Sequence, residues 1–422
     1  DANFIQNYYA SSRLHHLSTF KIELQNYVIE LRRQRGLTSE STGSARASGR
    51  RCIMYVDFDC FFVAVGLRSR PDLRGKPVAV SHCQNPSEAS SSDIASCNYE
   101  ARAAGVSNGM VVGRARQLCP NLIVIPYEFE QYREASRTLY QILVATTPQV
   151  QVGGMDEAIL DVTNLINDQS ADKGAQTKGV SRESVCAKMA ESLRQQVWEA
   201  TQCQVSVGIS ENILLAKLAT RWAKPHGQYY LPIEDAPTRL APLPVKHIPG
   251  IGETTARKLA DAGITTIRDL RNQPLARLQD MLGPKAGLNI QRMALGQDDR
   301  PLVTSPPRHS VGTEIGWGVR FETPAQVDKF LRDLCQEVHT RMATASVRGK
   351  SVTLRLKRRQ EGAGEARKHL GHGLCDNFSK SATLPQLTRE ADALYQTCSR
   401  LLGQLAVPPV DLRAVGIQVQ KL

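Results

Sequence analysis

The spacing of apolar residues predicts a helix near the start of the chain. Phe20, Leu24, Val28 and Leu31, together with Tyr27, recur every three or four positions, which is the period of one helix face. We expect the residues before this stripe to be irregular. Residues 36–49 are rich in Gly, Ser and Thr and predict a linker.

Strands and helices are both expected in the next third of the chain. The continuous apolar run at 52–56 predicts a buried strand, and the run at 60–67 predicts a helix packed against it. A second short strand is expected at 76–80. Residues 95–147 are expected to be mostly helical, with an irregular interruption at 105–113.

The middle of the chain predicts a hairpin followed by a strand and a helix. Residues 149–152 and 155–162 flank Gly153-Gly154, a pattern typical of two strands joined by a tight turn. A polar loop is expected at 166–182, followed by an amphipathic helix that ends near residue 200. The strand expected at 205–209 leads into a helix at 212–223.

Elements of both kinds continue to the C-terminus. Glycine and proline divide residues 244–300 into short helices, and residues 305–308 form a linker. The expected elements beyond the linker are strands at 351–357 and 414–420 and helices at 324–344 and 387–404. This mixture predicts an α+β protein with several domains.

The length and the charge of the chain indicate how many domains it has and what kind of partner it binds. A chain of 422 residues is too long for one compact core. Its formal net charge of +12 makes a polyanion the natural partner, although a solvated basic surface is the alternative. From Arg308 onward the chain holds 18 Lys and Arg against 11 Asp and Glu, so we expect a contact surface there.

Three further features bear on the class of protein. No run approaches twenty apolar residues, so we expect no membrane partner. The first residues lack a start Met and a signal-peptide pattern, which we interpret as the start of a fragment. The ten cysteines form no C-x-x-C pair, and Cys52, Cys60 and Cys119 lie in apolar runs; reduced, buried thiols are therefore expected.

Two acidic clusters follow apolar runs. Asp57 and Asp59 end the first strand, and Asp156 and Glu157 follow the glycine turn. Carboxylates directed into one cleft repel each other unless a cation lies between them, and two-metal phosphoryl transfer uses such an arrangement. Either cluster alone is more often an ordinary strand end, but the two together in a basic protein favour catalysis.

Two further patterns indicate contact with a nucleic-acid backbone. Gly250 and Gly252 precede a helix, whose exposed N–H groups could meet a phosphate, although a plain helix start is the alternative. In strand 351–357, apolar residues alternate with Thr353, Arg355 and Lys357, so one face is expected to be cationic. The basic run 357–359 could instead be a nuclear-localisation patch.

From residue 51 to residue 422 the sequence resembles the Y-family of translesion DNA polymerases in several ordered motifs. These motifs are Val-Asp-Phe-Asp-Cys-Phe-Phe at 56–62, Ser-Cys-Asn-Tyr-Glu-Ala-Arg at 96–102, Val-Ser-Asn-Gly-Met at 106–110, Asp-Glu-Ala-Ile-Leu-Asp at 156–161, Ser-Val-Gly-Ile-Ser-Glu-Asn-Ile-Leu-Leu-Ala-Lys-Leu-Ala at 206–219 and Lys-Pro-His-Gly-Gln-Tyr at 224–229. Agreement in order across so many motifs does not arise by chance.

The resemblance implies a right-hand architecture. The domains that it implies are an N-terminal extension at 1–50, a palm at 51–77 and 146–243, fingers at 78–145, a thumb with a helix-hairpin-helix at 244–304, and a little finger at 308–422. It also implies primer–template DNA as a partner, the nucleus as the location, and contacts with other translesion polymerases and the sliding clamp through regions outside this fragment.

The same resemblance implies the site residues. Two Mg²⁺ ions, which Mn²⁺ could replace, would be bound by Asp57, Asp156, Glu157 and the Phe58 carbonyl. Phe62 corresponds to a steric gate against the ribose 2′-OH. The residues expected to contact the nucleotide beside it are Phe61, Ser96, Tyr99, Arg102, Asn108 and Lys224. The chain departs from the family pattern at Gly154, where a Ser is usual.

The run Ser-Arg-Leu-His-His-Leu-Ser at 12–18 resembles the deoxycytidyl transferases of this family. That similarity implies that Arg13 serves as the template for dCTP and that Leu14 takes the space of the template base. The loop expected to receive the displaced guanine holds Lys368, His372 and Gly373.

Other interpretations remain open from the sequence. Composition alone would favour Arg13 as a surface arginine before a helix, in a polymerase that reads its template by ordinary pairing. A DNA-bound scaffold that recruits other polymerases is a second alternative, although it has no need for three metal-binding carboxylates. A helix-hairpin-helix nuclease is a third, and it leaves the 96–102 motif unexplained.

Overall fold

The computed structural model describes residues 4–37, 50–82, 90, 92–171, 181–364 and 371–422. The chain forms two compact units. We call residues 17–305 the central unit, and residues 1–16 with 306–422 the terminal unit. The expected N-terminal extension 1–50 is therefore divided between both units, and most of its expected linker, residues 38–49, lies outside the described residues.

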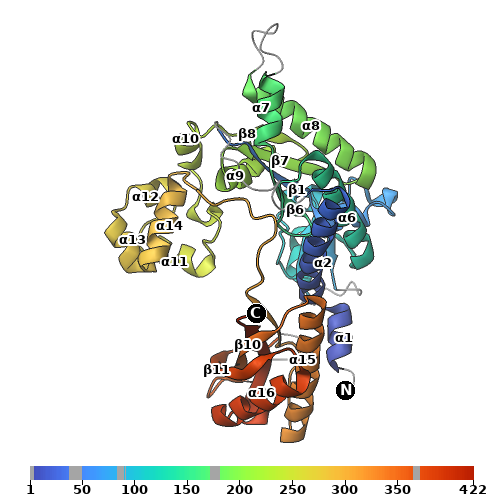
Figure 1. Cartoon of the computed structure of the whole chain (residues 1–422), viewed down its shortest axis with the longest axis vertical. Coiled ribbons are helices and arrows are strands. Elements are labelled where there is room, and N and C mark those ends of the chain that lie inside the picture. The colour runs from blue at the N-terminus through green and yellow to red at the C-terminus, as the bar shows by residue number, and fades with distance from the viewer. Residues whose placement is uncertain (1–3, 38–49, 83–89, 91, 172–180, 365–370) are drawn as a thin grey trace. The chain divides into compact units, whose positions relative to one another are not determined.

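A five-stranded sheet forms the centre of the central unit (Figure 1). Its strands, in spatial order, are β5 (Val150–Val152), β6 (Glu157–Asp161), β1 (Ile53–Phe58), β7 (Val205–Ser210) and β8 (Gln228–Tyr230). Neighbours are antiparallel except for β7 and β8. The predicted hairpin is confirmed, because β5 and β6 pair across Gly153-Gly154.

The two faces of this sheet bury different residues of β1. Met54, Val56 and Phe58 belong to the large core beneath the helices α2 (Arg13–Gln34), α6 (Phe129–Thr146) and α8 (Arg182–Thr201). Ile53 and Tyr55 pack on the other face with α9 (Ile213–Ala223). Since strand side chains alternate, Asp57 lies on the α9 face.

Helix α9 approaches β7 closely because Gly208 has no side chain. A Cβ at position 208 would lie 2.1 Å from the carbonyl oxygen of Ala216. Asn212 caps this helix by accepting a hydrogen bond from the Leu215 N–H at 2.8 Å. The sequence therefore fixes both where α9 begins and how near it lies to the sheet.

A small sheet forms beside the central one. Its strands are β3 (Ile94–Cys97), β2 (Val78–Ser81) and β4 (Ile123–Ile125), and the associated helices are α3 (Phe61–Gly66), η2 (Pro71–Leu73), α4 (Tyr99–Ala103) and α5 (Val112–Leu118). The expectation of a mostly helical segment at 95–147 missed β4. This strand has three residues, too few for periodicity to separate strand from helix.

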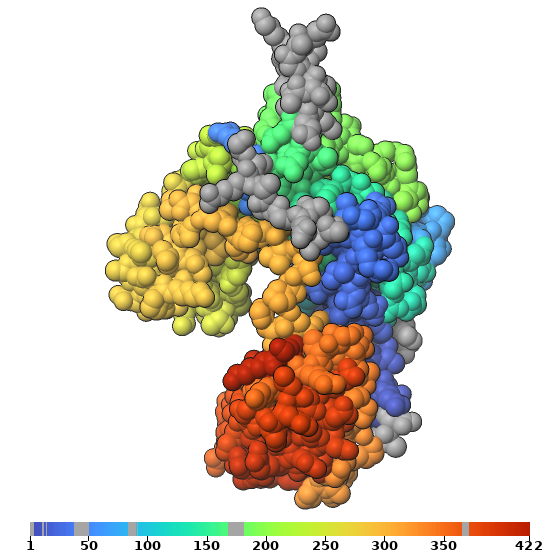
Figure 2. Space-filling view, in the orientation of Figure 1, coloured from blue at the N-terminus to red at the C-terminus, as the bar shows by residue number. Residues whose placement is uncertain are grey.

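Short helices occupy 236–294, which confirms the prediction for 244–300 and adds one helix before it. They are α10 (Ala236–Leu240), η3 (Val245–His247), α11 (Glu253–Asp261), α12 (Ile267–Arg271), α13 (Leu275–Leu282) and α14 (Pro284–Ala294). They share one apolar core with α9. Figure 1 shows α11–α14 grouped together, and the same yellow residues form one continuous mass in Figure 2. The loop expected at 166–182 is wrong in its first part, because α7 covers Thr163–Ala171.

The terminal unit contains an antiparallel sheet in the order β11 (Cys375–Thr388), β10 (Gly349–Arg359), β12 (Leu412–Gln420), β9 (Ser310–Ile315). Its helices are α1 (Phe4–Ser11), α15 (Pro324–Thr344), α16 (Ala391–Leu405) and η5 (Pro409–Asp411). The predicted alternation in β10 is confirmed for Val352, Leu354 and Leu356, which are buried, and for Arg355, which is exposed. It is wrong for Thr353, which is buried and hydrogen-bonded to the Ser381 hydroxyl.

The sequence missed two strands of the terminal unit, and one expectation for this unit is wrong. Strands β9 and β11 carry mainly polar or exposed side chains and gave no apolar alternation. The start of the chain is helical rather than irregular, because Ile5 and Tyr9, four residues apart on α1, are buried together in the core of this unit.

The cysteine prediction is confirmed for the nine cysteines within the described ranges: all are free thiols, and all but Cys375 are buried. Among the helices that the structure describes, none combines the length and apolar character that crossing a membrane requires. The α+β class with several domains is confirmed.

Candidate active site

Residues from the two acidic motifs meet at one end of the central sheet. Asp57 on β1 lies opposite Glu157 on β6 in the strand register. The Phe58 N–H donates a hydrogen bond to the Asp156 carbonyl at 2.9 Å, which holds the two motifs together. Asp57 is therefore a neighbour of Asp156 and Glu157, which follow it by 99 and 100 positions in the chain.

Burial makes negative charge costly in this cluster. It raises the pKa of Asp57, although the nearby Lys224 ammonium opposes the rise. Burial, followed by the charges of Asp57 and Glu157, raises the pKa of Asp156 to about 6. A cation placed among these groups would reverse both effects.

Lysines contact two of the three carboxylates. The Lys224 Nζ donates to Asp57 Oδ1. The Lys217 Nζ lies 3.3 Å from Glu157 Oε2 and donates to the Tyr55 hydroxyl at 2.6 Å. That hydroxyl in turn donates to Glu157. Lysine ammonium groups therefore partly balance the acidic cluster.

The chemistry of the donor set fits a hard divalent cation. Carboxylate oxygens from Asp57, Asp156 and Glu157 are the ligands that Mg²⁺ or Mn²⁺ prefers. Across the part of the chain that the structure describes, no three His, Cys, Asp or Glu side chains are gathered tightly enough to hold a metal ion. In this structure Lys224 contacts Asp57 and Lys217 contacts Glu157 instead.

The glycine turn before Asp156 is shaped by close backbone contacts. A Cβ at Gly153 would lie 2.7 Å from the Glu157 carbonyl oxygen. The Gly154 N–H donates to that oxygen at 2.9 Å, and the Gly154 carbonyl accepts from the Tyr140 hydroxyl at 2.7 Å. Gly154, where the family pattern has Ser, therefore keeps the turn in place through its backbone.

Four of the predicted nucleotide contacts gather around Cys97. Ser96 is buried on β3, and the Asn108 side chain accepts a hydrogen bond from the Cys97 N–H at 3.1 Å. The Arg102 Nε donates to the Cys97 carbonyl at 3.1 Å, and its guanidinium lies 5.1 Å from the centre of the Tyr99 ring. Both Arg102 and Asn108 are largely exposed, so they can meet a ligand.

The predicted steric gate lies in an aromatic cluster. The Phe62 ring is 4.7 Å from the Tyr132 ring and 6.1 Å from the Tyr127 ring. Phe61 is buried and stacks on Phe58 at 4.9 Å. Phe62 is thus fixed in place while part of it remains accessible.

Asp59 is a residue of this site that the sequence did not single out. It is 2% exposed and accepts hydrogen bonds from the Tyr99 hydroxyl at 2.8 Å and the Ser206 hydroxyl at 2.9 Å. The His226 N–H donates to it at 2.9 Å. Asp59 therefore joins the small sheet to the segment that carries Lys224.

The predicted DNA-contact glycines lie where a helix begins. Gly250 has a positive φ of 93°, which only glycine adopts easily, and Gly252 is the N-cap of α11. Both residues are exposed. The first N–H groups of α11 are therefore open to a phosphate.

The remaining predicted residues belong to the terminal unit. Arg13 and Leu14 begin α2, and Arg355 is exposed on β10. The Lys357 Nζ lies 3.0 Å from His372 Nε2, next to Gly373. Lys368 lies outside the described residues.

Three family models match the sequence. The impB/mucB/samB family matches residues 56–221, and the C-terminal domain of that family matches residues 308–422. The model described as "DNA polymerase-iota, thumb domain" matches residues 246–298.

Proteins similar to the chain fall into two groups. DNA repair protein rev1 of Schizosaccharomyces pombe is 38% identical over all of the chain, and DNA repair protein Rev1 of Drosophila melanogaster is 33% identical over all of it. The chain spans 43% and 46% of these relatives, which is less than half. DNA polymerase IV of Shewanella woodyi is 34% identical over 72% of the chain and 78% of the relative.

Proposed function

Because this chain belongs to the Y-family of DNA polymerases, we propose that it is a deoxycytidyl transferase, which adds dCMP to a primer end with Arg13 as the template for dCTP. Members of the family are DNA-directed nucleotidyltransferases that depend on divalent metal ions and carry out translesion synthesis. The choice of cytosine and the part played by Arg13 are the proposal.

One observation supports this choice over an ordinary templated polymerase. Similarity to the Rev1 relatives extends over 100% of the chain and so includes Arg13, whereas the match to DNA polymerase IV of Shewanella woodyi covers 72%. The arginine lies in the first turn of α2, directly after α1, whose Ile5 and Tyr9 are buried in the core of the terminal unit.

Hydrogen bonding explains why an arginine selects cytosine. The guanidinium of Arg13 presents parallel N–H donors, which match the O2 and N3 acceptors of cytosine. Thymine places an N3–H donor against one of them, and the unpaired donors would cost about 1–3 kcal/mol each. Purines are too large to fit beside the arginine.

The template base must leave its usual position for this pairing. In the proposal Leu14 takes its place, and a loop containing Lys368, His372 and Gly373 receives a displaced guanine. The His372 Nδ1 lies 2.7 Å from the Gly373 carbonyl, so the imidazole is held within this loop. An abasic site has no base to displace, so dCMP insertion should continue there.

Transfer itself takes place at the central sheet. Two Mg²⁺ ions bound by Asp57, Asp156, Glu157 and the Phe58 carbonyl would lower the charge repulsion between the primer 3′-OH and the triphosphate. Lys224 exchanges its contact with Asp57 for the triphosphate when the nucleotide binds. The residues that would hold the nucleotide with it are Phe61, Phe62, Ser96, Tyr99, Arg102 and Asn108.

Backbone contacts would hold the duplex without reading its sequence. The exposed start of α11 at Gly250 and Gly252 offers N–H groups to phosphate oxygens, and Arg355 and Lys357 offer positive charge on β10. The proposal includes a nuclear location. It also includes contacts with other translesion polymerases and the sliding clamp through regions outside this chain.

The test is single-nucleotide insertion opposite an abasic site, with each dNTP supplied separately. The wild-type chain should prefer dCTP, and Arg13→Ala should lose this preference while it retains slow metal-dependent insertion. If the preference is the same in Arg13→Ala, the arginine is not the template. A wild-type preference that follows the template base would favour an ordinary translesion polymerase instead.

A further inference from the structure

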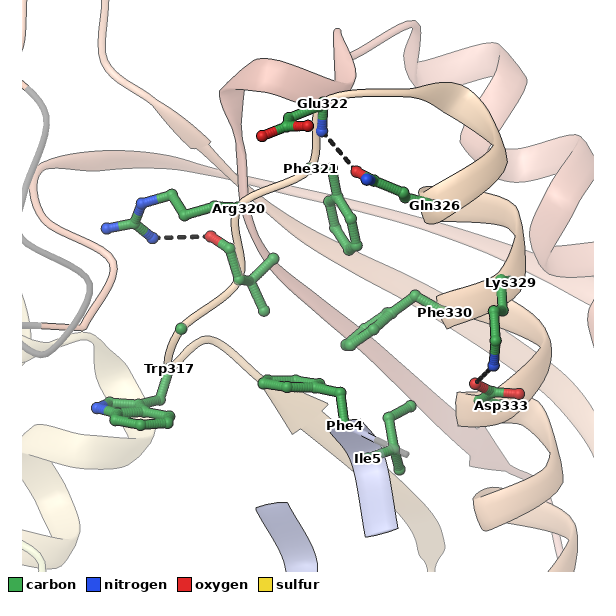
Figure 3. A pocket seen from close by; sticks show the side chains of 12 residues that line it. Phe4, Ile5, Trp317, Arg320, Phe321, Glu322, Gln326, Lys329, Phe330 and Asp333 are labelled. Carbon is green, nitrogen blue, oxygen red and sulfur yellow. Dashed lines mark hydrogen bonds and ion pairs between the residues drawn. The ribbon is translucent and has the colours of Figure 1, made fainter. Parts of the chain in front are cut away.

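The segment before Arg13 is part of the core of the terminal unit. Ile5 and Tyr9 on α1 are each 7% exposed, and both belong to the main apolar cluster of this unit. Figure 3 shows Phe4 directed toward Phe330 of α15, with ring centres 6.1 Å apart, beside a cavity of about 680 Å³. Helix α1 is therefore anchored to the unit through several side chains.

Tyr9 and His15, which lie before and after Arg13 in the sequence, also make polar and ring contacts within the terminal unit. The Tyr9 hydroxyl lies 2.5 Å from the Thr313 hydroxyl of β9. The Tyr9 ring is 4.4 Å from the His15 ring and 5.0 Å from the guanidinium of Arg341. Tyr9 and His15 therefore lie against each other, on either side of Arg13 in the sequence.

Arg341 of α15 connects three parts of the terminal unit. Its Nε donates to Glu337 Oε1 at 2.6 Å, its Nη1 to the Gly312 carbonyl at 3.0 Å, and its Nη2 to His15 Nδ1 at 2.7 Å. The side chain is 13% exposed. A planar guanidinium meets three acceptors in three fixed directions, and a lysine ammonium cannot replace it.

The protonation state of His15 follows from this contact. An arginine can only donate, so Nδ1 must be the unprotonated nitrogen of the ring. Burial, then the charges of Arg341 and His16, lower the pKa of His15 to about 4. His15 is thus neutral near pH 7, and its 3.9 Å approach to Glu337 is not an ion pair at that pH.

We propose that Arg341 is a positioning residue for Arg13, and that it sets the preference for dCTP from outside the nucleotide site. The proposal rests on the proposed templating role of Arg13. His15 is two residues after Arg13 in the first turn of α2, so fixing its ring fixes the backbone from which the Arg13 side chain extends. Hydrogen-bond recognition tolerates little displacement, and an error of about 1 Å can reduce a rate by about 100-fold.

The test compares Arg341→Met with Arg332→Met, a matched change on the same helix. Arg332 is 56% exposed, and its partners Tyr395 and Asp328 lie on α16 and α15, away from His15 in the sequence. Insertion of dCTP and dGTP opposite an abasic site gives a ratio of kcat/KM values for each variant. Arg341→Met should lower the dCTP:dGTP ratio by about 10-fold or more, and Arg332→Met should leave it unchanged.

The ratio separates positioning from general damage to the unit. Weaker DNA binding or partial unfolding lowers insertion of both nucleotides together, and an unchanged ratio in Arg341→Met would overturn the inference. His15→Gln keeps an acceptor for Arg341 and should retain more of the ratio than His15→Ala. Equal ratios in these two variants would also count against it.

Arg13→Ala serves as the reference for every variant. If Arg13→Ala abolishes the preference while Arg341→Met keeps it, the positioning role is wrong and the templating role stands. If Arg13→Ala keeps the preference, the templating role itself fails, whatever Arg341→Met shows.

Discussion

The carboxylates of the central unit and the arginine segment of the terminal unit differ in their electrostatics. The first is a cluster of buried negative charge, and the second is held by hydrogen bonds. Asp57, Asp156 and Glu157 gather negative charge at the end of a buried sheet, where burial raises the pKa of the first two. Arg13 lies in the first turn of α2, next to residues that are held by hydrogen bonds between Tyr9 and Thr313 and from Arg341 to the neutral His15.

This difference indicates what each region controls. A cluster of costly charge binds cations and lowers a barrier that every nucleotide shares. A hydrogen-bonding side chain held in one position discriminates between bases, because a displaced donor loses its partner. In the proposed function, the central unit therefore sets the rate of nucleotide insertion and the terminal unit sets the choice of base. Substitutions should alter the rate and the choice of base separately.

The largest expected effect comes from the carboxylates. Asp57→Asn or Asp156→Asn should reduce insertion of every dNTP on the order of 1,000-fold or more, because charge stabilisation in the transition state is lost. Single-turnover insertion with each dNTP measures this. The dCTP:dGTP ratio should stay the same, and a changed ratio would show that the two regions are not separate.

A second variant tests whether sugar choice belongs to the central unit. Phe62→Ala should reduce discrimination between dCTP and rCTP by roughly 10–200-fold, because a side chain that excludes the 2′-OH is removed. Insertion of each nucleotide opposite template G gives the ratio. Preference for cytosine over other bases should persist, and its loss would place base choice near Phe62 instead.

A third variant, Asp156→Asn, tests how the buried charge of the central unit affects the free energy of unfolding at different pH values. The folded pKa of Asp156, about 6, lies above its usual value of 3.8, so the folded state loses stability as pH rises from about 4 to 6 and keeps that loss above pH 6. In metal-free solution, Asp156→Asn should raise the free energy of unfolding by about 2–3 kcal/mol at pH 8 and change it little near pH 4.

Asp328 in the terminal unit is the control for this measurement. Hydrogen bonds from Tyr395 and then Arg332 lower the pKa of Asp328, so its stabilising effect is present near neutral pH and is lost as pH falls through its folded pKa. Asp328→Asn should therefore lower stability slightly at pH 8. Denaturant titration of both variants gives the signs, and equal signs would contradict this comparison.

The smallest expected effect concerns Lys217. Its ammonium lies 3.3 Å from Glu157 Oε2 and competes with a divalent cation for that oxygen. Lys217→Met should lower the Mg²⁺ concentration for half-maximal insertion by about threefold, a change of less than 1 kcal/mol. Titration of Mg²⁺ at saturating dCTP measures it, and a higher requirement would show that Lys217 assists metal binding.

The central sheet was easier to predict than its surroundings. Continuous apolar runs such as 52–56 identify buried strands, and the glycine turn at 153–154 identifies the hairpin that aligns Glu157 with Asp57. Strand β4 was missed because its three residues are too few to show the two-residue period of a strand. Strand β11 was missed because most of its side chains are exposed and form no apolar face.

The sequence was less informative where a residue acts through a distant partner. Asp59 received no role from the sequence, because its partners Tyr99, Ser206 and His226 come from three separate segments. Likewise, nothing near Arg341 in the chain indicates that it bonds His15, 326 positions away. Such roles become visible only when the fold brings the segments together.

Insertion opposite template C tests the central claim most directly. Templating by Arg13 requires dCTP there, whereas ordinary base pairing requires dGTP. If Arg13 is the template, the wild-type chain with Mg²⁺ should insert dCTP more efficiently than dGTP opposite this base, and Arg13→Ala should abolish that excess. A wild-type chain that prefers dGTP opposite template C would contradict the account, since base choice would then come from the template strand.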